Sequence, residues 1–299
     1  MIVTQGVRRR SPPGLPLPPS LPNVSSLPMP PISTPSPRAD VPPLLARLAL
    51  LARQAGEQIL QVYARGFEVR RKDDASPVTE ADELAERTIV AALHAMTPGV
   101  PVVAEEAASR GELPAAATRF WLVDPLDGTR EFVQRNGEFT VNIALVEDGA
   151  PRLGVVYAPA LDLLFAGEVG RGAWMEEGGV HAPIACRAVP DQGLHVLASR
   201  SHDDRAALQR WIERWLEHRP GPRRVAAWHA AGSSLKFGLL AAGRADLYPR
   251  LSRTMEWDTA AGHAVLRAAG GEVTDLAGAP LRYGKPGYEN PHFVARGRP

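Results

Sequence analysis

The amino-acid sequence predicts a layered α/β (α+β) fold that begins after an N-terminal segment without a core of its own. Apolar residues recur at helical spacing early in the chain. Apolar runs separated by glycine or proline follow, and helices then alternate with strands towards the end. Helices before and between two groups of strands are typical of layered architectures. The sequence divides accordingly into one half at 44–190 and another at 191–299, with no internal repeat.

The N-terminal segment, residues 1–43, is predicted to be a disordered tail. It is dense in proline and serine from Ser11 onwards and carries no periodic apolar pattern, so it cannot build a core. Prolines also interrupt the apolar run that a signal peptide would need after Arg8–Arg10. We expect a dispensable tail, and a proline-rich ligand for a partner domain is the alternative.

The composition limits the classes of function. The chain has 299 residues and a formal net charge of +1, so it lacks the basic surface that nucleic-acid binding requires. Its single cysteine, Cys186, cannot form an internal disulfide or a thiolate metal cluster, and no apolar run is long enough to span a bilayer. We expect a protein of the reducing cytoplasm, monomeric or homodimeric, with no nucleic acid as partner.

The first half is predicted to start with helices and to continue as an antiparallel sheet. A helix over 44–63 has Leu48 and Ile59 on its apolar side, and Thr79 caps a second helix with Asp82 in its first turn. The predicted strands are 67–72, 100–104, 120–123, 139–146, 153–157, 163–169 and 172–174, with a loop at 73–76.

The second half is predicted to alternate strands and helices from His195 onwards. The expected strands are 195–199, 245–248, 271–275 and 293–295, and the expected helices are 203–216, 232–240 and 257–268. Asp258 falls near the start of the last helix, where a carboxylate taken by itself is a helix cap or a partner of the helix dipole.

The most informative stretch of the sequence is the turn that ends the strand starting at Phe120. Asp124 and Asp127 follow the apolar run, and carboxylates buried there are costly unless a cation offsets them. Read alone, Asp127 and Gly128 are an ordinary turn pair. The turn can, however, present two carboxylates and a backbone carbonyl to one hard metal ion.

Further carboxylates occur where other predicted elements end or begin. Glu105 follows a short strand, Asp74 lies in the loop before the second helix, and Asp82 and Asp258 lie near helix starts. Without a cysteine cluster or a histidine pair at metal-ligand spacing, this is an all-oxygen donor set. Such a set suits Mg²⁺, Mn²⁺ or Ca²⁺ rather than zinc or copper.

Two long motifs make the chain resemble the lithium-sensitive inositol monophosphatase superfamily. Glu105–Glu106 with Asp124–Thr129 match its first signature, and Trp257–Gly262 match its second. Within the superfamily, 72–82 and 130–142 look most like the 3′(2′),5′-bisphosphate nucleotidases. The resemblance covers residues 44–297 and implies the α-β-α-β-α sandwich of inositol monophosphatase and fructose-1,6-bisphosphatase.

The resemblance implies a metal-binding first half that the second half completes. The implied ligands of two to three Mg²⁺ ions are Glu105, Asp124, the carbonyl of Leu126, Asp127, Asp258 and, for a weaker third ion, Asp82. Such ions can clamp the attacking and leaving oxygens of an in-line displacement by a metal-activated water. Asp74 and Thr129 would orient and deprotonate that water, and capping of the following turn is the simpler reading for Thr129.

The resemblance also implies a set of substrate contacts: Gly128, Thr129, Ser201, His202, Ser233, Lys236 and Arg250. Lys236 and Arg250 would supply cations for a second phosphate, although surface solvation is the usual fate of such side chains. The nucleotidases often carry lysine at the position of Arg130 and proline in the loop that holds Arg253, and these departures bear on how a substrate is held.

The function implied by the resemblance is Mg²⁺-dependent hydrolysis of adenosine 3′,5′-bisphosphate to AMP and phosphate. The sulfated nucleotide would be a further substrate and would connect the enzyme to sulfur assimilation. Inositol 1-phosphate and fructose 1,6-bisphosphate are the alternative substrates, and a non-catalytic nucleotide sensor is the alternative class. Members of the superfamily work in the cytoplasm or loosely on the cytoplasmic face of the inner membrane.

Overall fold

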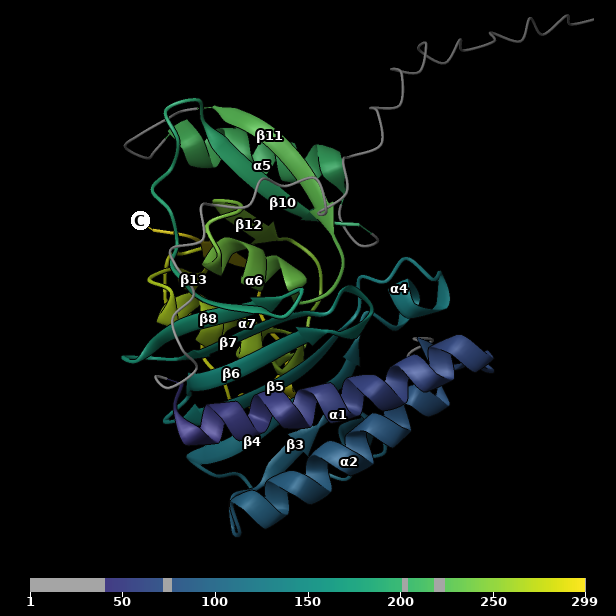
Figure 1. Ribbon diagram of the computed structural model, residues 1–299. Helices are drawn as coiled ribbons and strands as arrows, with labels where there is room; N and C mark the ends of the chain where they lie inside the picture. Colours follow the sequence, from purple (N-terminus) through teal and green to yellow (C-terminus); the bar gives the residue numbers. More distant parts are fainter. Residues whose placement is uncertain (1–40, 72–76, 201–203, 218–223, 299) are drawn as a thin grey trace, which may run out of the picture.

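Helices and sheets alternate in layers in the computed structural model, which describes residues 41–71, 77–200, 204–217 and 224–298 (Figure 1). The outer layers are α1 (Pro43–Arg65) with α2 (Glu80–Met96) on one side and α5 (Arg205–Glu217) on the other. Two helices, α6 (Leu235–Ala241) and α7 (Glu256–Ala268), lie between the sheets. This is the α-β-α-β-α sandwich that the sequence predicts.

The larger sheet has seven strands in the order β3-β4-β5-β6-β7-β8-β9. Its strands are β3 (Val102–Ala104), β4 (Arg119–Asp127), β5 (Thr140–Glu147), β6 (Ala150–Ala158), β7 (Leu163–Glu168), β8 (Gly172–Glu177) and β9 (Val180–Ile184). β3 and β4 are parallel, and each following pair is antiparallel. The predicted antiparallel sheet is therefore present, with one parallel strand at its edge.

The smaller sheet has five strands in the order β11-β10-β12-β14-β13. Its strands are β10 (Leu194–Ser199), β11 (Val225–Ala231), β12 (Leu247–Arg250), β13 (Glu272–Asp275) and β14 (Phe293–Arg296). β10 runs parallel to both of its neighbours, whereas β14 is antiparallel to β12 and β13. A separate two-stranded sheet joins β1 (Arg70–Arg71) to β2 (Pro77–Val78).

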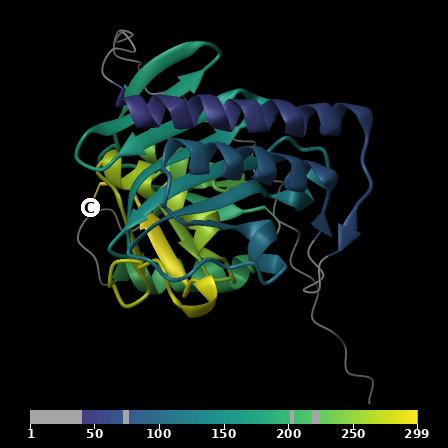
Figure 2. The ribbon, with the colours of Figure 1, turned by 90° about the horizontal axis from the view of Figure 1, so that it is seen from below.

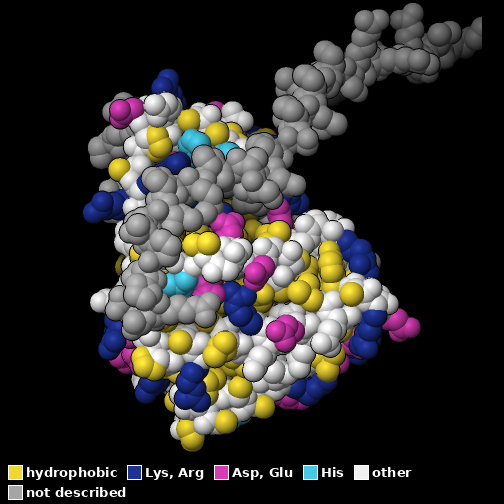
Figure 3. All heavy atoms as spheres, viewed as in Figure 1, with side chains coloured by type: hydrophobic (Ala, Val, Ile, Leu, Met, Phe, Trp, Pro, Cys, Tyr) yellow, Lys and Arg dark blue, Asp and Glu magenta, His cyan; other side chains and the backbone are white. Residues whose placement is uncertain are grey.

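The core lies between the layers, and the period-2 alternation of each strand divides it. On β4, Trp121 and Val123 belong to the cluster that α1 and α2 complete, with α2 in contact with β4 and α1 in contact with β5 and β6. The two helices lie side by side in Figure 2. Leu122 faces the opposite way, towards α6 and α7. A third cluster joins β10 to the apolar side of α5. On the face of the molecule that Figure 3 shows, basic and acidic side chains both occur among apolar ones.

The close packing of α7 on the larger sheet depends on a glycine. A Cβ added to Gly154 on β6 would lie 2.4 Å from the backbone oxygen of Ala261 on α7, which is far inside van der Waals contact. The helix can therefore approach β6 only because this position has no side chain. That approach sets where the N-terminal end of α7 lies.

The structure differs from the predicted elements at several places. Strands β9 and β11 were not predicted, α6 begins at Leu235 rather than at 232, and β4 continues to Asp127 instead of ending at Val123. Of the strand predicted over 67–72, only β1 is found among the described residues. The loop 73–76 and the tail up to residue 40 lie outside the described residues. Within the described part of the chain, no helix has the length and apolarity to cross a membrane.

Candidate active site

The end of β4 places two carboxylates on one irregular turn. Asp124 still pairs in register with β5, the register then shifts, and pairing resumes at Asp127. The backbone N–H of Leu126 donates to Oδ1 of Asp124 over 3.1 Å, which holds the turn. Gly128 follows with φ 89°, a left-handed conformation that favours glycine.

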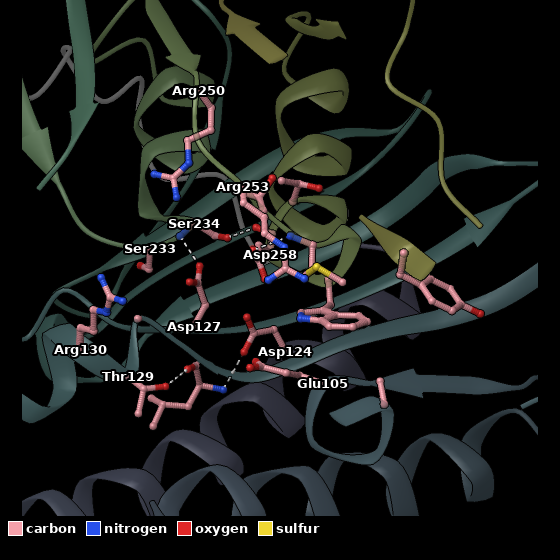
Figure 4. Close-up of a pocket in the computed structure, with 18 of the residues that line it drawn as sticks. Glu105, Asp124, Asp127, Thr129, Arg130, Ser233, Ser234, Arg250, Arg253 and Asp258 are labelled. Atoms are coloured by element: carbon pink, nitrogen blue, oxygen red, sulfur yellow. Dashed lines mark hydrogen bonds between the residues drawn. The ribbon is translucent and has the colours of Figure 1, made fainter. Parts of the chain in front are cut away.

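Two further carboxylates reach the same place from other elements. Glu105 opens the short helix α3 (Glu105–Ser109) directly after β3, whose parallel pairing with β4 brings both strand ends to one edge. Asp258 lies in the first turn of α7, where its Oδ2 accepts from the backbone N–H of Met255 over 2.8 Å. Figure 4 shows Glu105, Asp124, Asp127 and Asp258 directed towards a common space. The structure thus brings together carboxylates from both halves of the chain.

These carboxylates are electrostatically unfavourable as they stand. Burial raises the pKa of Asp124 well above its ordinary value, and the charges of Glu105, Asp127 and Asp258 raise it further. Burial likewise raises the pKa of Asp258 well above the ordinary value, and the charges of Asp127 and Glu105 raise it further. The pKa of Asp127 is also raised by burial, although Lys236 and hydrogen bonds from Ser234 oppose the shift.

An oxygen-only set of carboxylates, of which Asp124 is buried and the others are half-buried, fits a hard divalent cation. A cation in the common space would offset both the desolvation and the repulsion. Within the described residues, no three acidic, histidine or cysteine side chains already stand at the spacing of a closed metal site. The carboxylates would therefore have to close around an ion as it binds.

Thr129 and Asp82 form a pair at the edge of this space. Thr129 is the first residue of α4 (Thr129–Val133), and its Oγ1 lies 3.2 Å from Oδ1 of Asp82 and 3.3 Å from the carbonyl of Leu126. Oδ2 of Asp82 accepts from both the backbone N–H and the hydroxyl of Thr79, each over 2.8 Å. Asp82 is therefore both the N3 residue of the capping box that Thr79 begins and a hydrogen-bond partner of a residue that lines the pocket. Asp74 lies outside the described residues.

The pocket of about 930 Å³ that the carboxylates line also has a basic side. We call Arg130, Arg250 and Arg253 the basic group; all three line the same pocket as the carboxylates and are labelled in Figure 4. Arg250 is buried on β12, and Nε of Arg253 lies 3.1 Å from the carboxylate of Glu289. The volume is sufficient for a nucleotide-sized ligand.

The predicted substrate residues have different positions in the structure. Gly128, Ser233 and Lys236 line the pocket, whereas Ser201 and His202 lie outside the described residues. Lys236 is buried, and its Nζ donates to the carbonyls of Ala231 over 3.0 Å and Ser233 over 2.7 Å. In this arrangement Lys236 holds the backbone of the preceding loop as well as lining the pocket.

Sequence reasoning missed Ser234, which touches two of the clustered residues. Its backbone N–H donates to Oδ2 of Asp127 over 2.6 Å, and its hydroxyl donates to the backbone oxygen of Asp258. The only sequence signal was its position between Ser233 and Lys236, two residues that the resemblance implies as substrate contacts.

Comparison with known proteins agrees with this architecture. The model of the inositol monophosphatase family matches residues 41–296. The 3′(2′),5′-bisphosphate nucleotidase CysQ of Escherichia coli strain K12 is 47% identical over 254 residues, which cover 84% of this chain and 98% of that protein. CysQ of Buchnera aphidicola is 40% identical over 242 residues, 80% of this chain and 87% of that protein.

Solved structures give the same result. The crystal structure of CysQ from Bacteroides thetaiotaomicron, a bacterial member of the inositol monophosphatase family, has a TM-score of 0.68 at 38% identity and covers 85% of this chain and 97% of its own. An IMPase from Thermotoga maritima has a TM-score of 0.67 at 28% identity, with 85% and 91% covered. The chain belongs to the inositol monophosphatase family and is a phosphatase of that family.

Proposed function

We propose that the protein hydrolyses the 3′-phosphate of adenosine 3′,5′-bisphosphate, giving AMP and phosphate, and does so with bound Mg²⁺. The observation that carries the proposal is the pocket itself, which is lined both by the carboxylates and by the basic group. One phosphate fits beside cations held by the carboxylates, and a second fits the arginines. The CysQ relatives, which are named for a bisphosphate nucleotide substrate, support this choice.

Glu105, Asp124, Asp127, Asp258 and the carbonyl of Leu126 are the groups that would hold Mg²⁺. The bound ions would supply charge neutralisation for the phosphate and lower the pKa of water. The four side chains fix the ions from both halves of the chain, so the site is complete only when α7 is docked on the larger sheet. Two to three ions per site remain the expectation from the resemblance.

Thr129 and Asp82 are proposed to remove the proton from the attacking water. The hydroxyl of Thr129 lies within hydrogen-bonding distance of the Asp82 carboxylate, at 3.2 Å, and Thr129 lines the pocket. As the water attacks phosphorus, its proton passes to Thr129 Oγ1 while the hydroxyl proton passes to Asp82. The bond from phosphorus to the 3′ oxygen breaks, and that oxygen keeps the bonding electrons and takes a proton from solvent to become the 3′-hydroxyl of AMP. Asp82 thus has the geometry for the acceptor role that the resemblance implied for Asp74, besides its implied role at a third ion.

The basic group is proposed to hold the 5′-phosphate and so to select a bisphosphate. Arginine presents a planar fork of donors that matches phosphate oxygens. Arg130 follows Thr129 directly and Arg250 projects from the smaller sheet, so the two approach the pocket from different layers. Inositol 1-phosphate, which has one phosphate, would bring no second phosphate to these arginines.

A phosphate-release assay tests the proposal. We expect turnover of adenosine 3′,5′-bisphosphate with Mg²⁺, loss of turnover with a chelator, inhibition by Li⁺, and weaker turnover of inositol 1-phosphate and fructose 1,6-bisphosphate. Asp127→Asn should lower kcat at least about a thousandfold with an unchanged circular dichroism spectrum, because it removes a charge from the cation cluster. Faster turnover of inositol 1-phosphate would reverse the substrate assignment. Wild-type activity in the variant would remove Asp127 from the metal set.

A further inference from the structure

Asn142 is a buried amide that touches the carboxylate cluster from β5. Its side chain is 1% exposed, and its Nδ2 lies 3.3 Å from Oδ2 of Asp127 and 3.0 Å from Oγ of Ser234. An amide nitrogen has two protons, so it can donate to both acceptors at once. Because the Asp127 carboxylate accepts at Oδ2 from Asn142 and from the Ser234 backbone, that oxygen is fixed in place and the other oxygen is left to the pocket.

Ser234 connects Asn142 to Asp258 in the second half of the chain. Oγ of Ser234 accepts from Asn142 and donates to the backbone oxygen of Asp258 at the start of α7. Asn142 belongs to the larger sheet, Ser234 precedes α6, and Asp258 belongs to α7. The hydrogen bonds Asn142–Ser234–Asp258 therefore link the larger sheet, which holds Asp127, to α7, which holds Asp258.

The arrangement is unfavourable for stability alone. Oδ1 of Asn142 is buried and has no hydrogen-bond partner among the described residues. A buried polar atom left unsatisfied is a cost, and an apolar side chain of similar size would avoid it. The amide is thus better explained by what its nitrogen does for Asp127 and Ser234 than by packing.

We infer that Asn142 is a positioning residue for the cations, acting through Asp127 and through Ser234. It keeps one Asp127 oxygen turned away from the pocket and fixes the separation of Asp127 from the start of α7. Groups that orient metal ligands in this way govern metal affinity almost as strongly as the ligands themselves. The inference rests on the proposed cation-dependent function.

The test is Mn²⁺ binding to the full chain, measured by titration calorimetry and by electron paramagnetic resonance of free Mn²⁺. Asn142→Leu removes the donor at nearly constant volume and should raise the dissociation constant for Mn²⁺ about tenfold or more. Its melting temperature in chelator should stay equal to that of the wild type or rise, because the unsatisfied carbonyl is removed with the amide. Excess Mg²⁺ should restore much of the lost kcat, which would not be expected for a merely structural defect.

The matched control is Thr140→Val. Thr140 lies two residues earlier on the same face of β5, is fully buried, and has an Oγ1 with no hydrogen-bond partner in the part of the chain that the structure describes. The backbone of Thr140 pairs with that of Asp127, and the substitution leaves this pairing in place. It removes only a hydroxyl that makes no hydrogen bond to the described residues, so the Mn²⁺ affinity of the variant should equal that of the wild type. Equal Mn²⁺ affinity in wild type and Asn142→Leu would overturn the inference.

A second variant approaches the same bonds from the other side. Ser234→Ala removes the hydroxyl and keeps the backbone donor to Asp127, so it should also weaken Mn²⁺ binding. Added to Asn142→Leu, it should cost less than the two single effects combined, because both act through one chain of bonds. Additive effects would contradict the link through Ser234. If the wild type itself bound no Mn²⁺, the proposed cation-dependent function would fail first, and the inference with it.

Discussion

At the scale of single residues, the clustered carboxylates make stability and cation binding opposing demands. The pKa values of Asp124 and Asp258 lie well above the ordinary 3.8 because both groups are buried beside other acids. In the absence of a cation, the folded state therefore holds protons on these groups more tightly than the unfolded state does. The free energy of unfolding of the metal-free protein therefore falls as pH rises above 3.8 and through the raised pKa values of these two groups.

Because charge repulsion lowers stability at neutral pH, removing one of the charges by Asp258→Asn should raise it. In chelator, the variant should be more stable than the wild type at pH 7 by at least about 1 kcal/mol, because one repelling charge is removed. Its stability should also fall less steeply as pH rises. Urea unfolding across a pH series measures both quantities. With Mg²⁺ added, the order should reverse, because only the wild type gains binding energy. A variant less stable than the wild type in chelator at pH 7 would argue against repulsion in the cluster.

At the scale of elements, α7 contributes Asp258 to the site because the helix lies close to the larger sheet. It contacts β5, β6 and β7, although it belongs to the second half of the sequence. Gly154 on β6 permits the approach on one side. On the other, a Cβ at Gly262 would lie 2.5 Å from the ring of Phe237 on α6. The helix is thus confined on both sides, and Asp258 takes its place from that confinement.

Gly154→Ala should therefore disturb both stability and catalysis. The new Cβ would meet the backbone oxygen of Ala261 at 2.4 Å, so α7 must move away from β6. We expect a loss of about 1–3 kcal/mol in the free energy of unfolding, together with a lower kcat, because Asp258 moves with the helix. Gly297→Ala is the control, since its nearest contact would be an ordinary 3.6 Å. Unfolding free energy and kcat equal to those of Gly297→Ala would contradict the confinement of α7.

At the scale of the whole molecule, the sequence predicted the layers better than it predicted the contacts between them. The helical periodicity of α1 and the apolar runs of β5 and β6 could be recognised because each pattern is local. β11 was missed because its sequence is mostly alanine, and its strand depends on parallel pairing with β10. Within the site, too, the residues that lie in local motifs were the ones that could be predicted. Glu105, Asp124, Asp127 and Asp258 were predicted from motifs, and the structure brings them together.

Contacts that depend on distant segments could not be predicted in this way. Thr129 and Asp82 are 47 residues apart, and Asn142 and Ser234 are 92 residues apart. No local pattern reports that such side chains meet, because the meeting is decided by how α2, β5 and the loop before α6 pack. The metal-binding and catalytic roles of these residues stay predictions until the experiments above are done.

The layers are built from residues after 40, which gives a prediction for the N-terminal tail. A chain that starts at residue 41 keeps every helix and strand that forms the layers, and the family match also begins there. Deleting residues 1–40 should leave kcat, KM and the melting temperature unchanged. Steady-state kinetics and differential scanning calorimetry on both forms provide the comparison. A clear drop in either kcat or melting temperature would show that the tail contacts the folded part.

The order of the clustered carboxylates along the chain has a consequence for biosynthesis. Glu105, Asp124 and Asp127 emerge from the ribosome long before Asp258. The larger sheet is then already translated, whereas the last strands of the smaller sheet, β13 and β14, follow α7. A nascent chain therefore carries an unfinished acidic patch through most of its synthesis. If Asp258 holds a cation as proposed, a truncated chain that ends before α7 (Glu256–Ala268) should have no phosphatase activity.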